Sequence, residues 1–348
     1  MTQPKGNRFG LHRVIEPQGV LPQPALRVNN DMSVLYDNEI MCDVSTLNVD
    51  SASFTQIEEQ AKGNIDEIKK TMLDIVARFG KHKNPVTGSG GMFIGTVAKL
   101  GDALKGKIDL KEGDKIASLV SLSLTPLKIH EILAVHPETD QVDVRAQAIL
   151  FESAIWAKLP EDMPEKLALA VLDVAGAPAQ TARLVKPGDR VLIIGAAGKS
   201  GLLCCYEAKR RTGVTGEVIA VRRSSRGAEA LERAPFVDKI IEGSAVEAVD
   251  LLEKVEKATG GQLCDVVINC VNNPDCEMGS ILCCREGGIV YFFSMATSFT
   301  KAALGAEGIG KDINMIIGNG YTKGHAAITL ELMRESEFLR KEFEKRYL

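Results

Sequence analysis

The most regular pattern of hydrophobic and polar positions runs from Val191 to Arg223, VLIIGAAGKSGLLCCYEAKRRTGVTGEVIAVRR. Val191 to Ile194 is an apolar run without a polar break, which is typical of a strand buried on both faces of a parallel sheet. After Gly201 the apolar positions follow helical spacing until Gly213, a residue typical of helix C-terminal ends. Val218 to Val221 is a second apolar run. The pattern therefore predicts a strand, a turn, a helix and another strand.

The turn between the first strand and the helix is rich in glycine. In a dinucleotide-binding turn, glycines allow a tight bend, close approach of the backbone to the diphosphate and close packing of helix on strand. The helix N-terminus then offers backbone N–H groups and a favourable dipole to the diphosphate. A plain strand-to-helix turn is the alternative. The predicted cofactor-binding residues of this turn are Gly195, Ala197 (where the usual pattern has its second glycine), Gly198, Lys199, Ser200 and Gly201.

The alternation of strands and helices continues to the end of the chain. Apolar runs predict strands at 239–241, 266–271, 289–293 and 313–317, and helices alternate with most of them. This βα repetition predicts a doubly wound parallel sheet. The last helix is expected from about Ala326 to Tyr347, with one apolar stripe formed by Ile328, Leu332, Leu339, Phe343 and Tyr347.

The first half of the chain has the short, turn-rich apolar runs of a β domain. Residues 1–55 alternate such runs with Pro, Gly and Asn, which is typical of strands and turns. One clear helix is predicted at 64–79, because Asn64 is a good N-cap, Glu67 fits a capping box and Gly80 can end the helix. The expected domains are a β-rich catalytic domain at 1–164, a dinucleotide-binding domain at 165–324, and a C-terminal helix at 325–348 that packs back on the catalytic domain.

Composition sets the broad class of the protein. A chain of 348 residues corresponds to about two domains, and 45% hydrophobic with 25% charged residues is ordinary globular composition. A net charge of −4 suggests neither a nucleic-acid nor a membrane partner. No apolar run approaches the roughly 18 residues of a membrane span, and the N-terminus lacks a signal core, so we expect a cytoplasmic protein. None of the eight cysteines forms a CxxC motif, and we expect them reduced.

Several segments resemble known families. LVKPGDRVLIIGAAGKSG and EGDKIASL are similar to the medium-chain dehydrogenase/reductase superfamily. KGNRFGLHRVIEPQGVLPQPA, NVDSASFTQI and NPVTGSGGMFIGTVAKLG resemble the L-erythro-3,5-diaminohexanoate dehydrogenase family. The resemblance implies a GroES-like β-rich domain, a doubly wound Rossmann domain and a homo-oligomer, either a dimer or a tetramer. It also implies NAD- or NADP-dependent deamination of 3,5-diaminohexanoate to 5-amino-3-oxohexanoate in anaerobic lysine fermentation.

Departures from the zinc-dependent members of that superfamily are equally informative. Where those members have a catalytic cysteine, this chain has Asn48; the position of their histidine is Gly91; and their third ligand is replaced by Ala175. None of these residues offers a thiolate, an imidazole or a carboxylate. We therefore expect no metal site and a reaction that proceeds without zinc.

Four residues are candidates for contact with the substrate. Asp50 occupies the position of a hydroxyl proton relay in the superfamily, and a carboxylate there could accept a proton from an amine; a turn aspartate before a helix is the alternative. Arg145 could hold a carboxylate bidentately, or could be an outward strand arginine. Glu152 follows a strand and Asp173 precedes Ala175; surface placements are the alternatives for both.

The choice of cofactor depends on the residues after the second strand. Many NAD enzymes have an acidic residue there, which binds the ribose hydroxyl; here Arg222, Arg223 and Arg226 suggest a pocket for the 2′-phosphate of NADP, or else a solvated basic loop. Polar residues at later strand ends are also expected to bind the cofactor: Asn272, Ser294 and Asn319. The alternative functions are a zinc-free quinone or enoyl reductase and a non-catalytic dinucleotide-binding protein.

Overall fold

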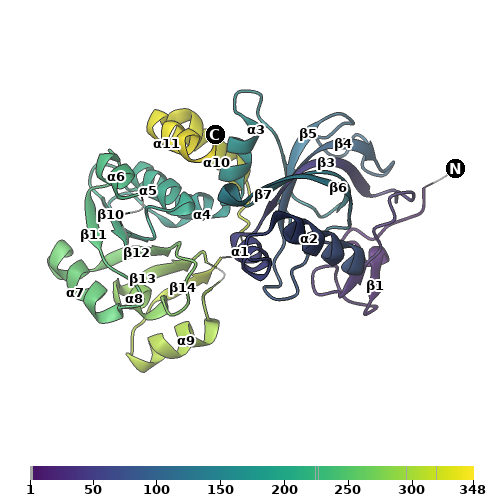
Figure 1. Ribbon diagram of the computed structural model, residues 1–348. Helices are drawn as coiled ribbons and strands as arrows, with labels where there is room; N and C mark the ends of the chain where they lie inside the picture. Colours follow the sequence, from purple (N-terminus) through teal and green to yellow (C-terminus); the bar gives the residue numbers. More distant parts are fainter. Residues whose placement is uncertain (1–2, 224, 226, 295, 319) are drawn as a thin grey trace. The chain divides into compact units, whose positions relative to one another are not determined.

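The computed structural model describes residues 3–223, 225, 227–294, 296–318 and 320–348. The chain forms two units, Met1–Leu169 and Ala170–Leu348, each with its own sheet (Figure 1). The division between them falls within a helix, α3 (Glu165–Leu172). Among the described residues no helix has both the length and the apolar character needed to cross a membrane.

The first unit is built on a six-stranded antiparallel sheet with the order β6-β7-β3-β4-β5-β8. Along β7 the side chains alternate in burial, with Val142 and Val144 inside and Asp143 and Arg145 toward the outer face, as a sheet with one buried face requires. A small sheet pairs β1 (Val14–Glu16) with β2 (Arg27–Val28). The large sheet consists of β3 (Glu39–Val49), β4 (Gly91–Leu100), β5 (Lys115–Ser118), β6 (Leu127–His136), β7 (Gln141–Phe151) and β8 (Trp156–Lys158).

Two helices cover this sheet: α1 (Ser51–Gln60) and α2 (Ile65–Phe79). The prediction of α2 is confirmed, because the Asn64 side chain accepts hydrogen bonds from the backbone of the first turn and Gly80 ends the helix at a φ of 71°. The apolar face of α2, which includes Ile68 and Met72, is buried in the core of the unit. The capping box is only half formed, since the N–H of Asn64 donates to the carbonyl of Ala61.

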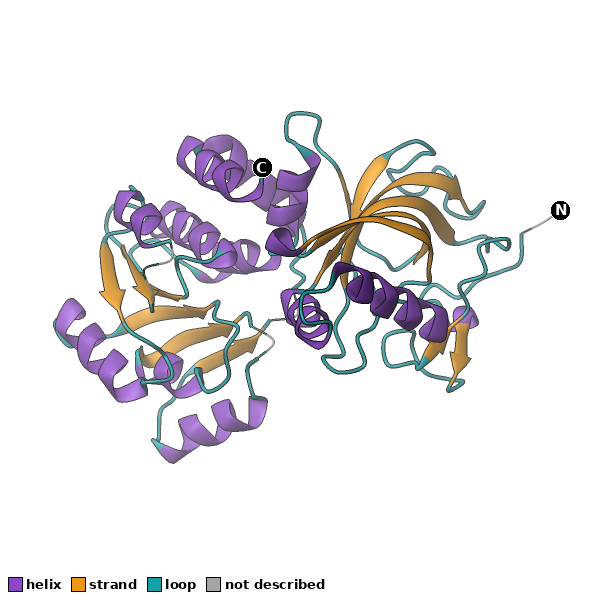
Figure 2. Cartoon of the chain, viewed as in Figure 1, coloured by secondary structure: helices purple, strands orange, loops and turns teal. Residues whose placement is uncertain are grey.

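The second unit is the doubly wound sheet that the sequence predicts. Its six parallel strands have the order β11-β10-β9-β12-β13-β14, so the direction of winding reverses between β9 and β12, where ligands of such sheets bind. Helices cover both faces (Figure 2). The elements are α4 (Gly176–Leu184), β9 (Arg190–Ile194), α5 (Lys199–Thr212), β10 (Glu217–Arg222), α6 (Ala228–Arg233), β11 (Lys239–Glu242), α7 (Ala248–Thr259), β12 (Cys264–Asn269), α8 (Glu277–Leu282), β13 (Cys284–Phe292), α9 (Phe299–Gly308) and β14 (Asn314–Ile317).

The C-terminal segment differs from its prediction. In place of one helix it forms α10 (His325–Glu335) and α11 (Glu337–Tyr347). The break occurs because Ser336 takes an extended conformation and its hydroxyl accepts a hydrogen bond from the N–H of Leu339, and a serine that caps a new helix ends the preceding one. Within the second unit α10 packs against α4 and α5.

Candidate active site

The glycine turn between β9 and α5 has the shape that a dinucleotide needs. Gly195 has a φ of +81°, which favours glycine, and the carbonyl of Val221 accepts hydrogen bonds from the N–H groups of Gly195 and Ala196 at 3.1 Å each. A Cβ on Gly201 would lie 2.2 Å from the carbonyl oxygen of Gly195. The turn therefore depends on these two glycines, and it leaves the backbone accessible where a diphosphate would approach.

A charged pair lies at the start of α5. Gly198 is the N-cap and makes no side-chain cap, so the first N–H groups of the helix point toward an approaching anion. Lys199 is the first residue of the helix, and its Nζ lies 2.6 Å from Oδ2 of Asp173. Both side chains are mostly buried, at 23% and 21% exposure. Asp173, predicted as a catalytic candidate, therefore contacts the nucleotide turn through Lys199.

Polar side chains meet at the carboxyl ends of β12 and β13. The hydroxyl of Ser294 donates to Oδ1 of Asn272 at 3.3 Å, and these residues follow strands on one side of the point where the sheet reverses. This edge is where a doubly wound sheet binds the nicotinamide half of a dinucleotide. The third residue predicted here, Asn319, lies outside the described residues.

The basic loop after β10 lies against the glycine turn. A Cβ on Gly227 would lie 3.1 Å from both the Cβ and the carbonyl oxygen of Ala197. Arg222 is close to two carboxylates, with its Nη2 3.2 Å from Glu242 and 3.9 Å from Glu232. Arg223 is exposed, and Arg226 lies outside the described residues. Gly227 thus lies next to the glycine turn, where a 2′-phosphate pocket is expected, and Arg222 is partly neutralised by Glu242 and Glu232.

In the first unit, Asp50 follows β3 and precedes α1. Its Oδ2 accepts a hydrogen bond from the N–H of Gly90 at 3.0 Å, and α1 receives no side-chain cap from it. Asp50 therefore lies in the turn before a helix, as the alternative interpretation expected. Its carboxylate, however, points toward the loop before β4. A Cβ on Gly90 would lie 2.5 Å from the backbone nitrogen of Ser123, so this close approach requires glycine.

The positions of two zinc ligands in the superfamily lie side by side here. Asn48 on β3 and Gly91 on β4 are neighbours, since a Cβ on Gly91 would lie 2.0 Å from the carbonyl oxygen of Asn48. Oδ1 of Asn48 accepts a hydrogen bond from Gln141 at 3.5 Å. Within the described residues no three His, Cys, Asp or Glu side chains form a group that could hold a metal ion. The strand end carries amides and a carboxylate in place of metal ligands.

A second carboxylate, Asp140, lies at the same strand end and was missed by the sequence reasoning. Its Oδ2 accepts from the hydroxyl of Ser51 at 2.5 Å, and its carbonyl accepts from the N–H of Val49 at 2.9 Å. Its φ of 57° is a left-handed conformation that aspartate tolerates. Next to it, Oε1 of Gln141 is buried without a hydrogen-bond partner in the structure. Acceptor groups thus gather around residues 48–51.

The other two candidates lie on the surface. Arg145 is 71% exposed and forms an ion pair with Glu131 on the neighbouring strand β6, which is the outward placement of the alternative interpretation. Glu152 is also exposed, and its Oε2 accepts a hydrogen bond from Nδ2 of Asn38 at 3.2 Å. The structure does not bring either side chain to Asp50.

The eight cysteines are free thiols and most of them are buried, as the sequence predicts. Burial raises the pKa of Cys283 to about 12 and that of Cys284 to about 11. A thiol with such a pKa is a poor nucleophile at neutral pH. These two cysteines therefore belong to the core of the second unit.

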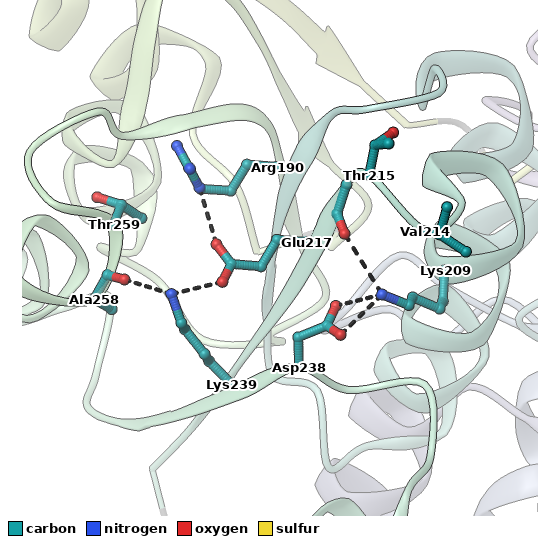
Figure 3. Close-up of a pocket in the computed structure, with 10 residues that line it drawn as sticks. Arg190, Lys209, Val214, Thr215, Glu217, Asp238, Lys239, Ala258 and Thr259 are labelled. Atoms are coloured by element: carbon teal, nitrogen blue, oxygen red, sulfur yellow. Dashed lines mark hydrogen bonds and ion pairs between the residues drawn. The ribbon is translucent and has the colours of Figure 1, made fainter.

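A cavity of about 490 Å³ opens at the amino ends of β9, β10 and β11 (Figure 3). Its charged side chains neutralise one another: Glu217 lies 3.0 Å from Arg190 and 2.6 Å from Lys239, and Asp238 lies 2.8 Å from Lys209. In parallel sheets ligands bind at the carboxyl ends of the strands. This cavity lies at the amino ends of the strands, so we do not assign it to the cofactor. The ion pairs of Glu217 with Arg190 and Lys239 link neighbouring strands there.

The parallel sheet, its glycine turn and the antiparallel domain form a fold that recurs in solved structures, among them an enoyl reductase and an alcohol dehydrogenase. Among solved structures, a mycobacterial protein complexed with NADPH has a TM-score of 0.56 at 16% identity, covering 89% of each chain. The alcohol dehydrogenase TADH from Thermus sp. ATN1 has a TM-score of 0.53 at 19% identity, covering 88% of this chain and 85% of that one. These similarities establish the fold.

Relatives with higher sequence identity show which family the chain belongs to. Residues 12–160 match the family model of the L-erythro-3,5-diaminohexanoate dehydrogenase N-terminal domain. Proteins named L-erythro-3,5-diaminohexanoate dehydrogenase from Acetoanaerobium sticklandii and Fusobacterium nucleatum are 62% and 60% identical to this chain over 344 residues. The alignments cover 99% of this chain and 100% and 99% of those proteins, respectively. The chain belongs to the L-erythro-3,5-diaminohexanoate dehydrogenase family.

Proposed function

We propose that this protein is a nicotinamide-dependent amine dehydrogenase. It converts L-erythro-3,5-diaminohexanoate, water and oxidised cofactor to 5-amino-3-oxohexanoate, ammonia and reduced cofactor. The observation that carries the proposal is the identity of 62% over 99% of the chain with a relative of that name. The family resemblance of the N-terminal motifs and the glycine turn of the second unit support the same conclusion.

The acceptor groups of the first unit match the chemistry of this substrate. A diamino acid carries two ammonium groups, and burying an unpaired charge is costly. Asp50 and Asp140 supply two carboxylates next to the same strand end. Gln141 adds a buried carbonyl oxygen that can accept an N–H bond. A quinone, which has no cation to pair, would gain nothing from these groups.

The residues divide the work between binding and proton transfer. The glycine turn and Lys199 would hold the diphosphate, and Ser294 with Asn272 would face the nicotinamide, which accepts a hydride from the amine-bearing carbon when bound. Asp50 takes the proton of the reacting amine, which becomes an imine. After this proton is released to solvent, Asp50 is again a carboxylate; it accepts a proton from the water that adds to the imine carbon and returns it to the nitrogen that leaves as ammonia. Asp140 pairs with the ammonium group that does not react.

The proposal also includes the choice of cofactor and the conditions in which the enzyme acts. NADP binds at least as well as NAD, because Arg222, Arg223 and Arg226 replace the acidic residue that favours the ribose hydroxyl of NAD. The enzyme acts without zinc, in the cytoplasm, in the fermentation of lysine. It works as a homo-oligomer and needs neither a nucleic acid nor a membrane as partner. The superfamily resemblance and the sequence composition support these points.

The proposal is tested by following the absorbance of NADH and NADPH with purified protein. L-erythro-3,5-diaminohexanoate should reduce the cofactor and release one ammonia per cofactor. Amines without a carboxylate, alcohols and quinones serve as controls. Oxidation of NADPH by a quinone or enoyl substrate, with no reaction of the diamino acid, would replace the proposal with a reductase. Cofactor binding with no turnover of any compound would indicate a non-catalytic binding protein.

A further inference from the structure

The last turn of the chain contacts the glycine turn of the nucleotide site. Nη1 of Arg346 donates a hydrogen bond to the carbonyl oxygen of Ala197 at 3.1 Å, across 149 positions of sequence. The ring of Tyr347 faces Lys199, with Nζ 5.9 Å from the ring centroid. Two consecutive residues of α11 therefore touch the two residues that flank Gly198.

Several contacts hold α11 in this place. Glu342 is 9% exposed at its side chain and lies 2.6 Å from Nη2 of Arg233 on α6. Phe343 is fully buried, and its ring centroid is 5.6 Å from that of Tyr347. The hydroxyl of Ser336 caps the start of the helix. The helix is fastened at its start and along its length, so its last turn has a defined position.

These contacts concentrate positive charge around the N-terminus of α5. Lys199 and Arg346 both lie there, and Gly227 lies next to the same residue, Ala197. Asp173 neutralises part of the charge of Lys199. A guanidinium bonded to a backbone carbonyl fixes the peptide that a diphosphate must approach, and an aromatic face favours a cation above it.

We propose that the last turn of α11 is part of the dinucleotide site, with Arg346 and Tyr347 as positioning residues. Arg346 holds the peptide of Ala197 so that the turn stays open to the diphosphate, and Tyr347 holds the ammonium of Lys199 next to the N-terminus of α5. The ligand chemistry is the diphosphate that NAD and NADP share. This inference rests on the proposed function, because it assigns residues to the cofactor of that reaction.

The test measures dissociation constants for NADH and NADPH by fluorescence titration, without substrate. Arg346→Ala should weaken both cofactors by about three- to tenfold, because the peptide of Ala197 loses its charge-assisted hydrogen bond. Arg346→Lys should restore most of the affinity. Tyr347→Leu should weaken both by about threefold, whereas Tyr347→Phe keeps the ring and should bind as the unmodified protein does. Lys341→Ala, an exposed cation on the same helix, is the matched control.

The outcomes separate this inference from the proposed function. If the unmodified protein binds neither cofactor, the proposed function itself is wrong. If it binds and all variants bind equally well, the role of α11 is wrong while the dinucleotide site stands. A loss that is the same for Arg346→Ala and Arg346→Lys, together with a lower unfolding temperature, would show that α11 only stabilises the fold and would also overturn the inference.

Discussion

Lys199 and Asp173 form a partly buried ion pair of 2.6 Å at the start of the helix that follows the glycine turn. The carboxylate therefore reduces the positive charge that an approaching diphosphate meets. This geometry supports an electrostatic role for Asp173 at the proposed cofactor site, in addition to its prediction as a candidate for contact with the substrate.

Replacing Asp173 by Asn should test that role. We expect Asp173→Asn to bind NADH and NADPH at least as tightly as the unmodified protein, because the carboxylate 2.6 Å from Nζ of Lys199 no longer offsets the charge of that lysine. Its kcat should remain within a few-fold of normal. A fall in kcat of roughly 10²-fold or more at unchanged affinity would assign proton transfer to Asp173. Lys199→Ala is the companion variant and should weaken both cofactors.

Substitutions of the two carboxylates of the first unit, Asp50 and Asp140, should affect different kinetic constants. Asp50→Asn keeps the shape but removes the base, so kcat should fall by roughly 10²–10⁴. Asp140→Asn should mainly raise KM, by roughly tenfold, because pairing with the ammonium that does not react is nearly equal in ground and transition states. Initial rates with the diamino acid measure both. Near-normal kcat in Asp50→Asn would remove that residue from the mechanism.

The basic loop should discriminate between the two cofactors. Arg223→Ala should weaken NADPH about tenfold and leave NADH nearly unchanged, since a charge-assisted bond to the 2′-phosphate is worth roughly 1.5–3 kcal/mol. Arg222→Ala should have a smaller effect, because Glu242 lies 3.2 Å from that guanidinium. Paired titrations with NADH and NADPH provide the measurement. Equal losses for the two cofactors would identify the loop as a general surface feature.

Removal of metal ions should not affect activity. Asn48 and Gly91 lie side by side at the positions of two zinc ligands in the resembling superfamily; Gly91 has no side chain, and the Asn48 amide is not one of the thiolate, imidazole or carboxylate groups that bind zinc. Chelator treatment should leave kcat unchanged, and elemental analysis of active protein should find no stoichiometric zinc. One zinc per chain with chelator-sensitive turnover would contradict the expectation.

His82 should make the fold sensitive to mild acid. Its ring is fully buried and neither ring nitrogen has a hydrogen-bond partner in the described part of the chain; this burial lowers the pKa of His82 to about 4. As the pH is lowered from 6.5 to 4, the unfolded chain binds a proton at this histidine and the folded chain does not. The free energy of unfolding therefore decreases as the pH is lowered, by about 3 kcal/mol in total. Urea unfolding at pH 7 and 4 measures the change. His82→Phe should flatten this part of the profile; an unaltered profile would refute the assignment.

Much of the second unit could be predicted from the sequence because its signals are local. The run from Val191 to Ile194, the glycines that follow it and the helix that ends at Gly213 all lie within one short segment. Each depends on a turn conformation, a cap or a spacing that neighbouring residues determine. The same holds for α2, where Asn64 and Gly80 define the two ends.

The contacts that complete the candidate sites depend on distant pairs and were not predicted. Asp140 reaches Ser51 only through the register of β7 against β3, which places Gln141 opposite Asn48. Arg346 reaches Ala197 from the last helix. For Arg145 the sequence left two interpretations open, because strand alternation sets its face but not which face is buried; the exposure of 71% and the pairing with Glu131 on β6 correspond to the outward placement.

The break at Ser336 has a consequence for how the C-terminal region can vary. A continuous helix rotates by about 100° per residue, so any insertion along it turns the faces of everything downstream. Because Ser336 starts a new helix with its own cap, the phase of α11 is counted from that residue and not from α10. A residue added or deleted in α10 would therefore not change the face of α11 on which Tyr347 lies. A residue added or deleted within α11, before Tyr347, would rotate Tyr347 away from Lys199.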